Sequence, residues 1–239
     1  MKSLKISLPK NQIDLLIIID LVLICLSLWL LQATNIDLDI QKHLFISEGK
    51  HWLIDRTDPI KKFIFYNFPK VLFGLAAAYC LVCAVLGFRK KGNEKFYKNR
   101  HRFTLIFISL ILIPLSVGNI KKFTNVYCPA QLEIYDGDKP YAKIFDSYPS
   151  DFHSNKKGLC FPAGHCVTGF AFMILFFALR KKSQQIFSLL SAITLGWILG
   201  WYQMAKGVHF FGDTLISMLV CFLLAALIAR IYTNFQEYD

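Results

Sequence analysis

Six long apolar segments constrain what this 239-residue chain can fold into. Each has about the ~20 residues that a helix needs to cross ~30 Å of hydrocarbon. A backbone exposed to lipid must satisfy its own hydrogen bonds, so such segments form helices. The segments are Ile13–Gln32, Val71–Phe88, Phe103–Asn119, Phe161–Leu179, Ile186–Tyr202 and Phe210–Tyr232. We therefore expect an all-α protein, a six-transmembrane helical bundle that forms a single domain over residues 1–239.

The composition excludes an ordinary soluble domain, because 55% of the residues are hydrophobic and the mean hydropathy is +0.43. The first apolar segment is longer than the hydrophobic region of a usual signal peptide. No small-residue cleavage site follows Leu31, since the next residues are Gln32, Ala33, Thr34 and Asn35. We expect this segment to be retained as a membrane helix.

Basic residues in the short connections predict the orientation. The connection of residues 89–102 holds seven basic residues and one acid, Arg180–Lys182 is entirely basic, and Lys2, Lys5 and Lys10 precede the first span. Six spans place these three clusters on one side, which the positive-inside rule makes cytoplasmic. Both termini are then cytoplasmic, and the loops of residues 35–70 and 120–160 lie outside, in the periplasm of a bacterial inner membrane.

The formal net charge of +11 also admits a nucleic-acid partner. The densest basic cluster, however, is a short connection beside the membrane, where anionic lipid headgroups are the simpler partner. We expect contact with the lipid bilayer and no nucleic acid. The sequence leaves the oligomeric state open.

The seven cysteines fall into two groups. Cys128 and Cys160 flank the second outer loop, and the sequence leaves open whether they form a disulfide in an oxidising compartment. The others lie in apolar spans and are expected to be small packing residues; they are Cys25, Cys80, Cys83, Cys166 and Cys221.

Two polar motifs open apolar segments: Pro162-Ala163-Gly164-His165 and His209-Phe210-Phe211-Gly212-Asp213. The third span ends with Lys121 and Lys122. The predicted topology places all three helix ends on the outer side, so residues far apart in sequence converge there. Polar groups at helix mouths inside a bundle are costly unless they are used, which favours an active-site cleft on this face.

The spacing of these residues suggests a catalytic arrangement. Gln203, Lys206, His209 and Asp213 step by three, three and four, which places them on one face if the segment is helical. Asp213 would orient one ring nitrogen of His209 and leave the other free to attack phosphorus. His165 would protonate the leaving oxygen.

The loop before His165 also suits anion binding. Pro162 suits the first turn of a helix, and Gly164 lets backbone N–H groups approach an anion there. Two alternatives compete with this interpretation. A histidine near a helix end is commonly a capping or interfacial residue, and two histidines with a carboxylate can bind zinc. Nearby lysines would repel a cation, so we expect no metal.

These motifs resemble the signature of the type 2 phosphatidic acid phosphatase superfamily, which contains membrane lipid phosphatases. The family pattern is Lys-x6-Arg-Pro, Pro-Ser-Gly-His and Ser-Arg-x5-His-x3-Asp. The corresponding residues here begin at Lys121, Pro162 and Tyr202. The resemblance implies that His209 forms a phosphohistidine, with Asp213 as its partner.

The resemblance further implies that His165 is the general acid, that Lys121 holds phosphate oxygens, and that no cofactor is needed. Four positions depart from the pattern: Cys128 and Gln203 replace the two arginines, Ala163 replaces the serine of the second motif, and Tyr202 stands at the serine of the third. An amide or thiol does not reproduce a guanidinium. Our hypothesis is that Lys206 supplies the missing charge. The expected phosphate-binding residues are Lys121, Lys122, Ala163, Gly164, Gln203 and Lys206.

An outer-face site at membrane depth predicts a lipid phosphate or pyrophosphate as the substrate. A lipid A phosphate is the first choice by resemblance, followed by undecaprenyl pyrophosphate, phosphatidylglycerol phosphate and phosphatidic acid. Alternatives are a phosphotransferase that uses the same site, an inactive protein that binds lipid phosphate, and a transporter. Separation of His165 and His209 by more than about 8 Å would favour the transporter, because both must reach one phosphate.

Overall fold

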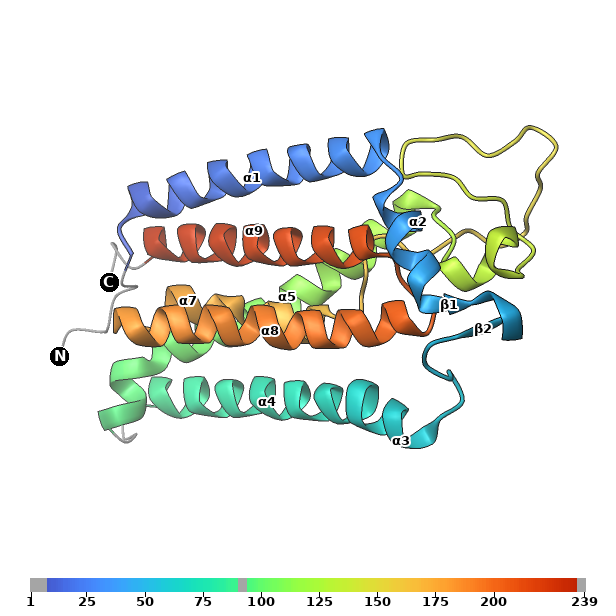
Figure 1. The fold of residues 1–239 in the computed structure, drawn as a ribbon. Coiled ribbons are helices and arrows are strands. Elements are labelled where there is room, and N and C mark those ends of the chain that lie inside the picture. Colours follow the sequence, from blue (N-terminus) through green and yellow to red (C-terminus); the bar gives the residue numbers. More distant parts are fainter. Residues whose placement is uncertain (1–7, 90–93, 236–239) are drawn as a thin grey trace.

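The computed structural model describes residues 8–89 and 94–235 and shows a bundle of nearly parallel helices (Figure 1). The long helices are α1 (Lys10–Ala33), α4 (Phe68–Phe88), α5 (Glu94–Thr124), α8 (Lys182–Ala205) and α9 (Phe211–Phe235). Helices α1, α5 and α8 begin at the end of the bundle where α4 and α9 finish, and the long loops lie at the opposite end. We call the latter the loop end. Among the basic residues that predict orientation, Lys2, Lys5, Lys90 and Lys91 lie outside the described residues.

Five helical stretches within the described residues are long and apolar enough to cross a membrane, which indicates a multi-pass membrane protein. The structure does not confirm a sixth long span. The predicted span Phe161–Leu179 is helical only over Val167–Ala178. There, α6 (Val167–Phe170), the 3-10 turn Ala171–Met173 and α7 (Ile174–Ala178) contain 4, 3 and 5 residues.

Burial explains why this segment need not be a regular helix. Its apolar side chains form the centre of the largest core cluster, and Phe170, Ile174 and Phe177 are fully buried there. Irregular backbone is tolerated at membrane depth when protein rather than lipid surrounds it. A hydropathy pattern predicts that such a segment is apolar, but it does not distinguish a lipid-facing span from an enclosed one.

The second span begins earlier than predicted. Asp58 caps α3 (Pro59–Lys62) by accepting hydrogen bonds from the N–H groups of Ile60 and Lys61, both at 3.0 Å. The helix continues through a π-helical turn, Phe63–Asn67, into α4 and spans Pro59–Phe88. The segment predicted as a loop to Lys70 is therefore helical over its last part, and an aspartate before a proline is the signal for that start.

The remainder of the first outer loop is also structured. It contains α2 (Ile36–Gln41) and a small antiparallel hairpin of β1 (Phe45–Ile46) and β2 (His51–Trp52). Trp52 packs against Phe45, with 5.0 Å between ring centroids. The all-α expectation therefore holds for the bundle, and the short hairpin is an addition at the loop end.

A tight turn separates α8 from α9, so the predicted helical face through Gln203, Lys206, His209 and Asp213 is not continuous. Helix α8 ends at Ala205, and Gly207 adopts a φ of +69°. Arg56 donates hydrogen bonds to the carbonyl oxygens of Lys206 at 2.7 Å and Gly207 at 3.0 Å. The turn is thus held from the first outer loop.

Substitution of Gly207 by alanine tests this turn. The left-handed φ disfavours a Cβ, and a Cβ here would overlap the Trp52 ring. We expect Gly207→Ala to lower the free energy of unfolding by about 1–3 kcal/mol in thermal denaturation in detergent. Gly118→Ala is the matched control. Gly118 lies in α5, and a Cβ added to it would contact no neighbouring group within 4 Å. It should be neutral or stabilising by about 0.5–1 kcal/mol, and equal losses in both variants would contradict the assignment.

Candidate active site

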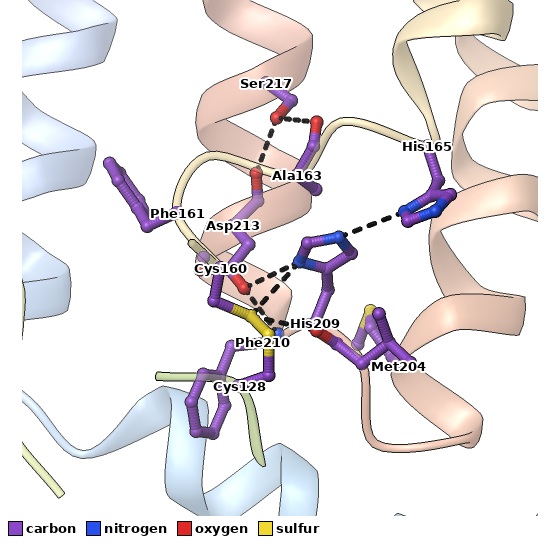
Figure 2. Close-up of polar contacts among 12 residues, drawn as sticks. Cys128, Cys160, Phe161, Ala163, His165, Met204, His209, Phe210, Asp213 and Ser217 are labelled. Atoms are coloured by element: carbon purple, nitrogen blue, oxygen red, sulfur yellow. Dashed lines mark hydrogen bonds and ion pairs between the residues drawn. A yellow bond between two sulfur atoms is a disulfide. The ribbon is translucent and has the colours of Figure 1, made fainter. Parts of the chain in front are cut away.

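His209 and Asp213 form a buried pair at the start of α9 (Figure 2). Nδ1 of His209 lies 3.1 Å from Oδ2 of Asp213, and the side chains are 1% and 2% exposed. The same carboxylate oxygen accepts a hydrogen bond from the N–H of Phe210 at 2.9 Å. The backbone thus fixes the carboxylate, and the carboxylate fixes which ring nitrogen of His209 carries the proton.

His165 lies on the other side of the His209 ring. Its Nδ1 is 3.3 Å from Nε2 of His209, and the ring centroids are 5.5 Å apart. The two histidines are therefore closer than the separation of about 8 Å beyond which a transporter would be favoured. His165 is partly exposed whereas His209 is buried, so the pair is accessible from the His165 side.

The segment before His165 is a loop, and the prediction that Pro162 occupies the first turn of a helix is wrong. The N–H of Ala163 donates to the carbonyl of Asp213 at 3.0 Å, and Ser217 Oγ donates to the carbonyl of Ala163 at 2.7 Å. The loop is thereby attached to the first turns of α9. Because its N–H is engaged, Ala163 offers neither side chain nor amide to a phosphate in this state.

The two lysines at the end of α5 point in different directions. Lys121 is partly buried, and its Nζ lies 3.5 Å from where a Cβ on Gly164 would stand. Lys122 is exposed, and its Nζ donates to Asn119 at 3.0 Å. The structure thus places Lys121 beside the His165 loop and directs Lys122 away from it.

Tyr66 lies beside His165, and the ammonium groups of two further lysines lie near its ring. The Tyr66 ring lies 5.0 Å from the His165 ring. Nζ of Lys70 lies 3.7 Å from the Tyr66 centroid, and Nζ of Lys206 lies 5.8 Å from it. Sequence reasoning missed Tyr66 and Lys70 as site residues. Their four-residue spacing before an apolar run is a signal, but only if the helix is known to start before them.

These positive charges and burial act on both histidines. Burial, followed by His209, Lys121, Lys70 and Lys206, lowers the pKa of His165 from 6.5 to about 3. Burial, followed by Lys121 and Lys206, lowers the pKa of His209 well below 6.5. Both rings are therefore neutral in the free protein near pH 7, and an incoming anion would meet the ammonium groups of Lys70, Lys121 and Lys206.

Gln203 is buried at the position of a family arginine. Its side chain is 1% exposed, and neither its amide nitrogen nor its amide oxygen has a hydrogen-bond partner among the described residues. An unpaired buried amide costs about 1–3 kcal/mol, so it marks a place where a ligand can supply the partner.

Asp37 of α2 is a second carboxylate that sequence reasoning missed. It accepts a hydrogen bond from the N–H of Gly212 at 2.7 Å and so contacts the first turn of α9. Burial, followed by the charge of Asp213, raises the pKa of Asp37 to about 7. Asp37 therefore connects the first outer loop to the helix that carries Asp213.

Cys128 and Cys160 form a disulfide across 32 positions, and Cys160 Sγ lies 3.4 Å from Nδ1 of His209. Cys160, His209 and Asp213 together form a group with metal-ligand spacing. Zinc binds thiolate sulfur, which a disulfide does not offer, and two remaining ligands fall short of the usual three or four. The donor set therefore fits a metal poorly.

The family model of the PAP2 superfamily matches residues 102–237, which is more than half of the chain. The match contains α5 from residue 102 onward, the His165 loop and the His209–Asp213 pair. The chain belongs to the PAP2 superfamily. This membership indicates phosphatase activity on phosphate esters. No curated protein and no solved structure matches the chain.

Replacement of Gln203 by methionine tests whether its amide serves a ligand. We expect the free energy of unfolding to be unchanged or to rise by about 1–3 kcal/mol, because two unpaired buried polar atoms are removed. Phosphate release should fall roughly tenfold or more in kcat/KM, because a hydrogen bond to a charged group is lost.

Gln41→Met is the matched control for this substitution. Gln41 is equally buried and its amide oxygen also lacks a partner among the described residues, but its amide nitrogen donates to the carbonyl of Met204 at 2.9 Å. This variant should be less stable than Gln203→Met by about 1 kcal/mol, because only Gln41→Met breaks a hydrogen bond. Equal stability of the two variants, with phosphate release intact in Gln203→Met, would show that Gln203 is purely structural.

Proposed function

We propose that this protein is a membrane phosphatase that hydrolyses a lipid phosphate or pyrophosphate through a phosphohistidine intermediate. The observation that carries the proposal is the chain of contacts from Asp213 through His209 to His165. One ring nitrogen of the central histidine is held by a carboxylate, and the other faces a second imidazole. This arrangement provides a nucleophile and a proton donor at one phosphorus.

In the first step, Nε2 of His209 attacks phosphorus while Nδ1–H donates to Asp213. The Nε2–P bond forms as the ester P–O bond breaks, and protonated His165 gives its proton to the leaving oxygen. In the second step, neutral His165 takes a proton from water. The water oxygen attacks phosphorus, the N–P bond breaks, and inorganic phosphate leaves.

Two features of the free site must change when phosphate binds. His165 occupies the space in front of Nε2 of His209, so its ring must move aside to admit phosphorus. Its low pKa must also rise, and the negative charge of the phosphate acts in that direction. Substrate binding would thereby convert His165 into the acid that the first step needs.

The phosphate oxygens would contact Lys121, the Gly164 loop and the Gln203 amide. Lys70 and Lys206, which share the Tyr66 ring, would supply the charge of the missing arginines. The bonds of Ala163 and the direction of Lys122 argue against direct roles for these two residues. Metal ions are not required, because ammonium groups provide the positive charge.

We propose that the loop end faces the periplasm of a bacterial inner membrane, with both termini cytoplasmic. The basic connections support this orientation through the positive-inside rule. A lipid A phosphate remains the first choice of substrate, with undecaprenyl pyrophosphate, phosphatidylglycerol phosphate and phosphatidic acid next. An alcohol that intercepted the phosphohistidine would make the protein a phosphotransferase.

Purified protein should release phosphate from at least one lipid of this panel in the presence of a metal chelator. His209→Ala should abolish release and the labelled phosphohistidine that an alkaline quench traps. His165→Ala should reduce release by about 10²–10⁴-fold, because it removes the general acid. His43→Ala, an exposed histidine in the first outer loop, is the control and should retain activity. No release from any lipid would leave the non-catalytic lipid-binding alternative, and transfer to added glycerol would identify the phosphotransferase.

The pH profile tests the role of Lys70. Because the charge of Lys70 lowers the pKa of His165, Lys70→Gln should raise that pKa. Protonated His165 then persists to higher pH in the complex with substrate, so the basic limb of the kcat profile should move upward by roughly 0.5 pH unit. Lys122→Gln removes the same charge from the exposed side of α5 and should not shift this limb. Equal shifts in the two variants would attribute the effect to net charge alone.

A further inference from the structure

A cavity separate from the two histidines lies at the loop end of the bundle. Its volume is about 720 Å³. Arg56, Lys139, His153, Lys156 and Lys157 line it, and no carboxylate does. We call this cavity the basic chamber. Its lining comes from both outer loops and from the α8–α9 turn, so these segments together build it.

The disulfide separates the basic chamber from the candidate active site. Cys128 and Val208 line the chamber. The disulfide partner of Cys128, Cys160, lies on the other side against the ring of His209. None of the catalytic side chains lines the chamber, so it is a different site that shares a wall with the first.

Hydrogen bonds fix the wall of the basic chamber that carries Lys156 and Lys157. The hydroxyl of Tyr127 donates to the carbonyl of Lys156 at 2.7 Å, and the N–H of Gly158 donates to the side-chain oxygen of Asn125 at 2.8 Å. The N–H of Cys160 donates to the carbonyl of Val126 at 2.9 Å. A ligand would therefore pay little to order this segment, because it is already attached.

The positive charge of the chamber is only partly compensated. Lys139 pairs with Asp138 at 2.8 Å. Within the described part of the chain, Lys156 and Lys157 are exposed and pair with no carboxylate. Arg56 donates to two backbone carbonyl oxygens, which are neutral and so do not cancel its positive charge. Like charges around one hollow repel each other, and an anion in the hollow relieves that repulsion.

We propose that the basic chamber binds a second phosphate-class anion. The anion is either a free phosphate or another phosphate of a lipid headgroup whose first phosphate lies beside His165. The guanidinium of Arg56 both lines the chamber and holds the carbonyls of Lys206 and Gly207. An anion there therefore contacts a group that also positions the turn before His209.

The test is calorimetric binding of inorganic pyrophosphate to the full chain in neutral-lipid nanodiscs. A His209→Asn background prevents turnover, so the result does not depend on the proposed hydrolysis. We expect two pyrophosphate sites. Lys156→Gln with Lys157→Gln should weaken one site at least tenfold, because two charge-assisted contacts are lost, while Lys121→Gln should weaken the other.

The matched control, Lys181→Gln with Lys182→Gln, removes the same charge from the opposite end of the bundle and should leave both sites unchanged. Thermal unfolding would verify that every variant is folded. Retention of both sites in the Lys156/Lys157 variant, or equal weakening in the control, would overturn the proposal. A single site that is lost with Lys121 would also overturn it.

A second arm distinguishes the two sources of the anion. The titration is repeated in nanodiscs that contain phosphatidic acid. Competition at the site sensitive to Lys156 and Lys157 would identify a lipid headgroup as the occupant, and undiminished pyrophosphate binding there would identify a free phosphate. Either result supports an anion site in the chamber, and hydrolysis need not occur for the arms to differ.

Discussion

The turn between α8 and α9 is the constraint on which the site depends. Both outer loops hold it: the N–H of Ile54 donates to the carbonyl of Ala205 at 3.0 Å, and the N–H of Ala130 donates to that of Gly207 at 2.9 Å. Arg56 adds its two hydrogen bonds to the same turn. His209 follows directly, so its ring is positioned by loops that the membrane helices alone do not fix.

The sequence predicted the chemical residues better than their local structure. His165, His209 and Asp213 do meet at one end of the bundle, because helix ends on one side of a membrane converge. The continuous helix through Lys206 was wrong, since Gly207 turns the chain. The role of Lys70 could not be predicted, because its four-residue step from Tyr66 pairs the two only if the helix begins before them, and only tertiary packing brings Tyr66 beside His165.

The positive charge of the candidate site comes from several lysines rather than from the two arginines of the family pattern. The family pattern places two arginines near the phosphate, each with a rigid fork of donors. Here the ammonium groups of Lys70, Lys121 and Lys206 come from three separate elements, and a buried Gln203 stands at the position of one family arginine. Ammonium groups are compact, flexible and strongly hydrated. Under the proposed function, such a site would bind phosphate through its charge rather than through a fixed donor geometry.

The loop from Phe161 to Cys166 affects how a lipid would be handled. Its attachment through Ala163 to Ser217 places it one to two turns inside the loop end of α9. Under the proposed function, lipid phosphorus would lie at a similar level, at the boundary between headgroups and hydrocarbon. Withdrawing acyl chains into water costs about 0.8 kcal/mol per methylene. On the proposed function, a phosphate bound at that depth would avoid this extraction energy, and the lipid would keep its acyl chains in the bilayer throughout turnover.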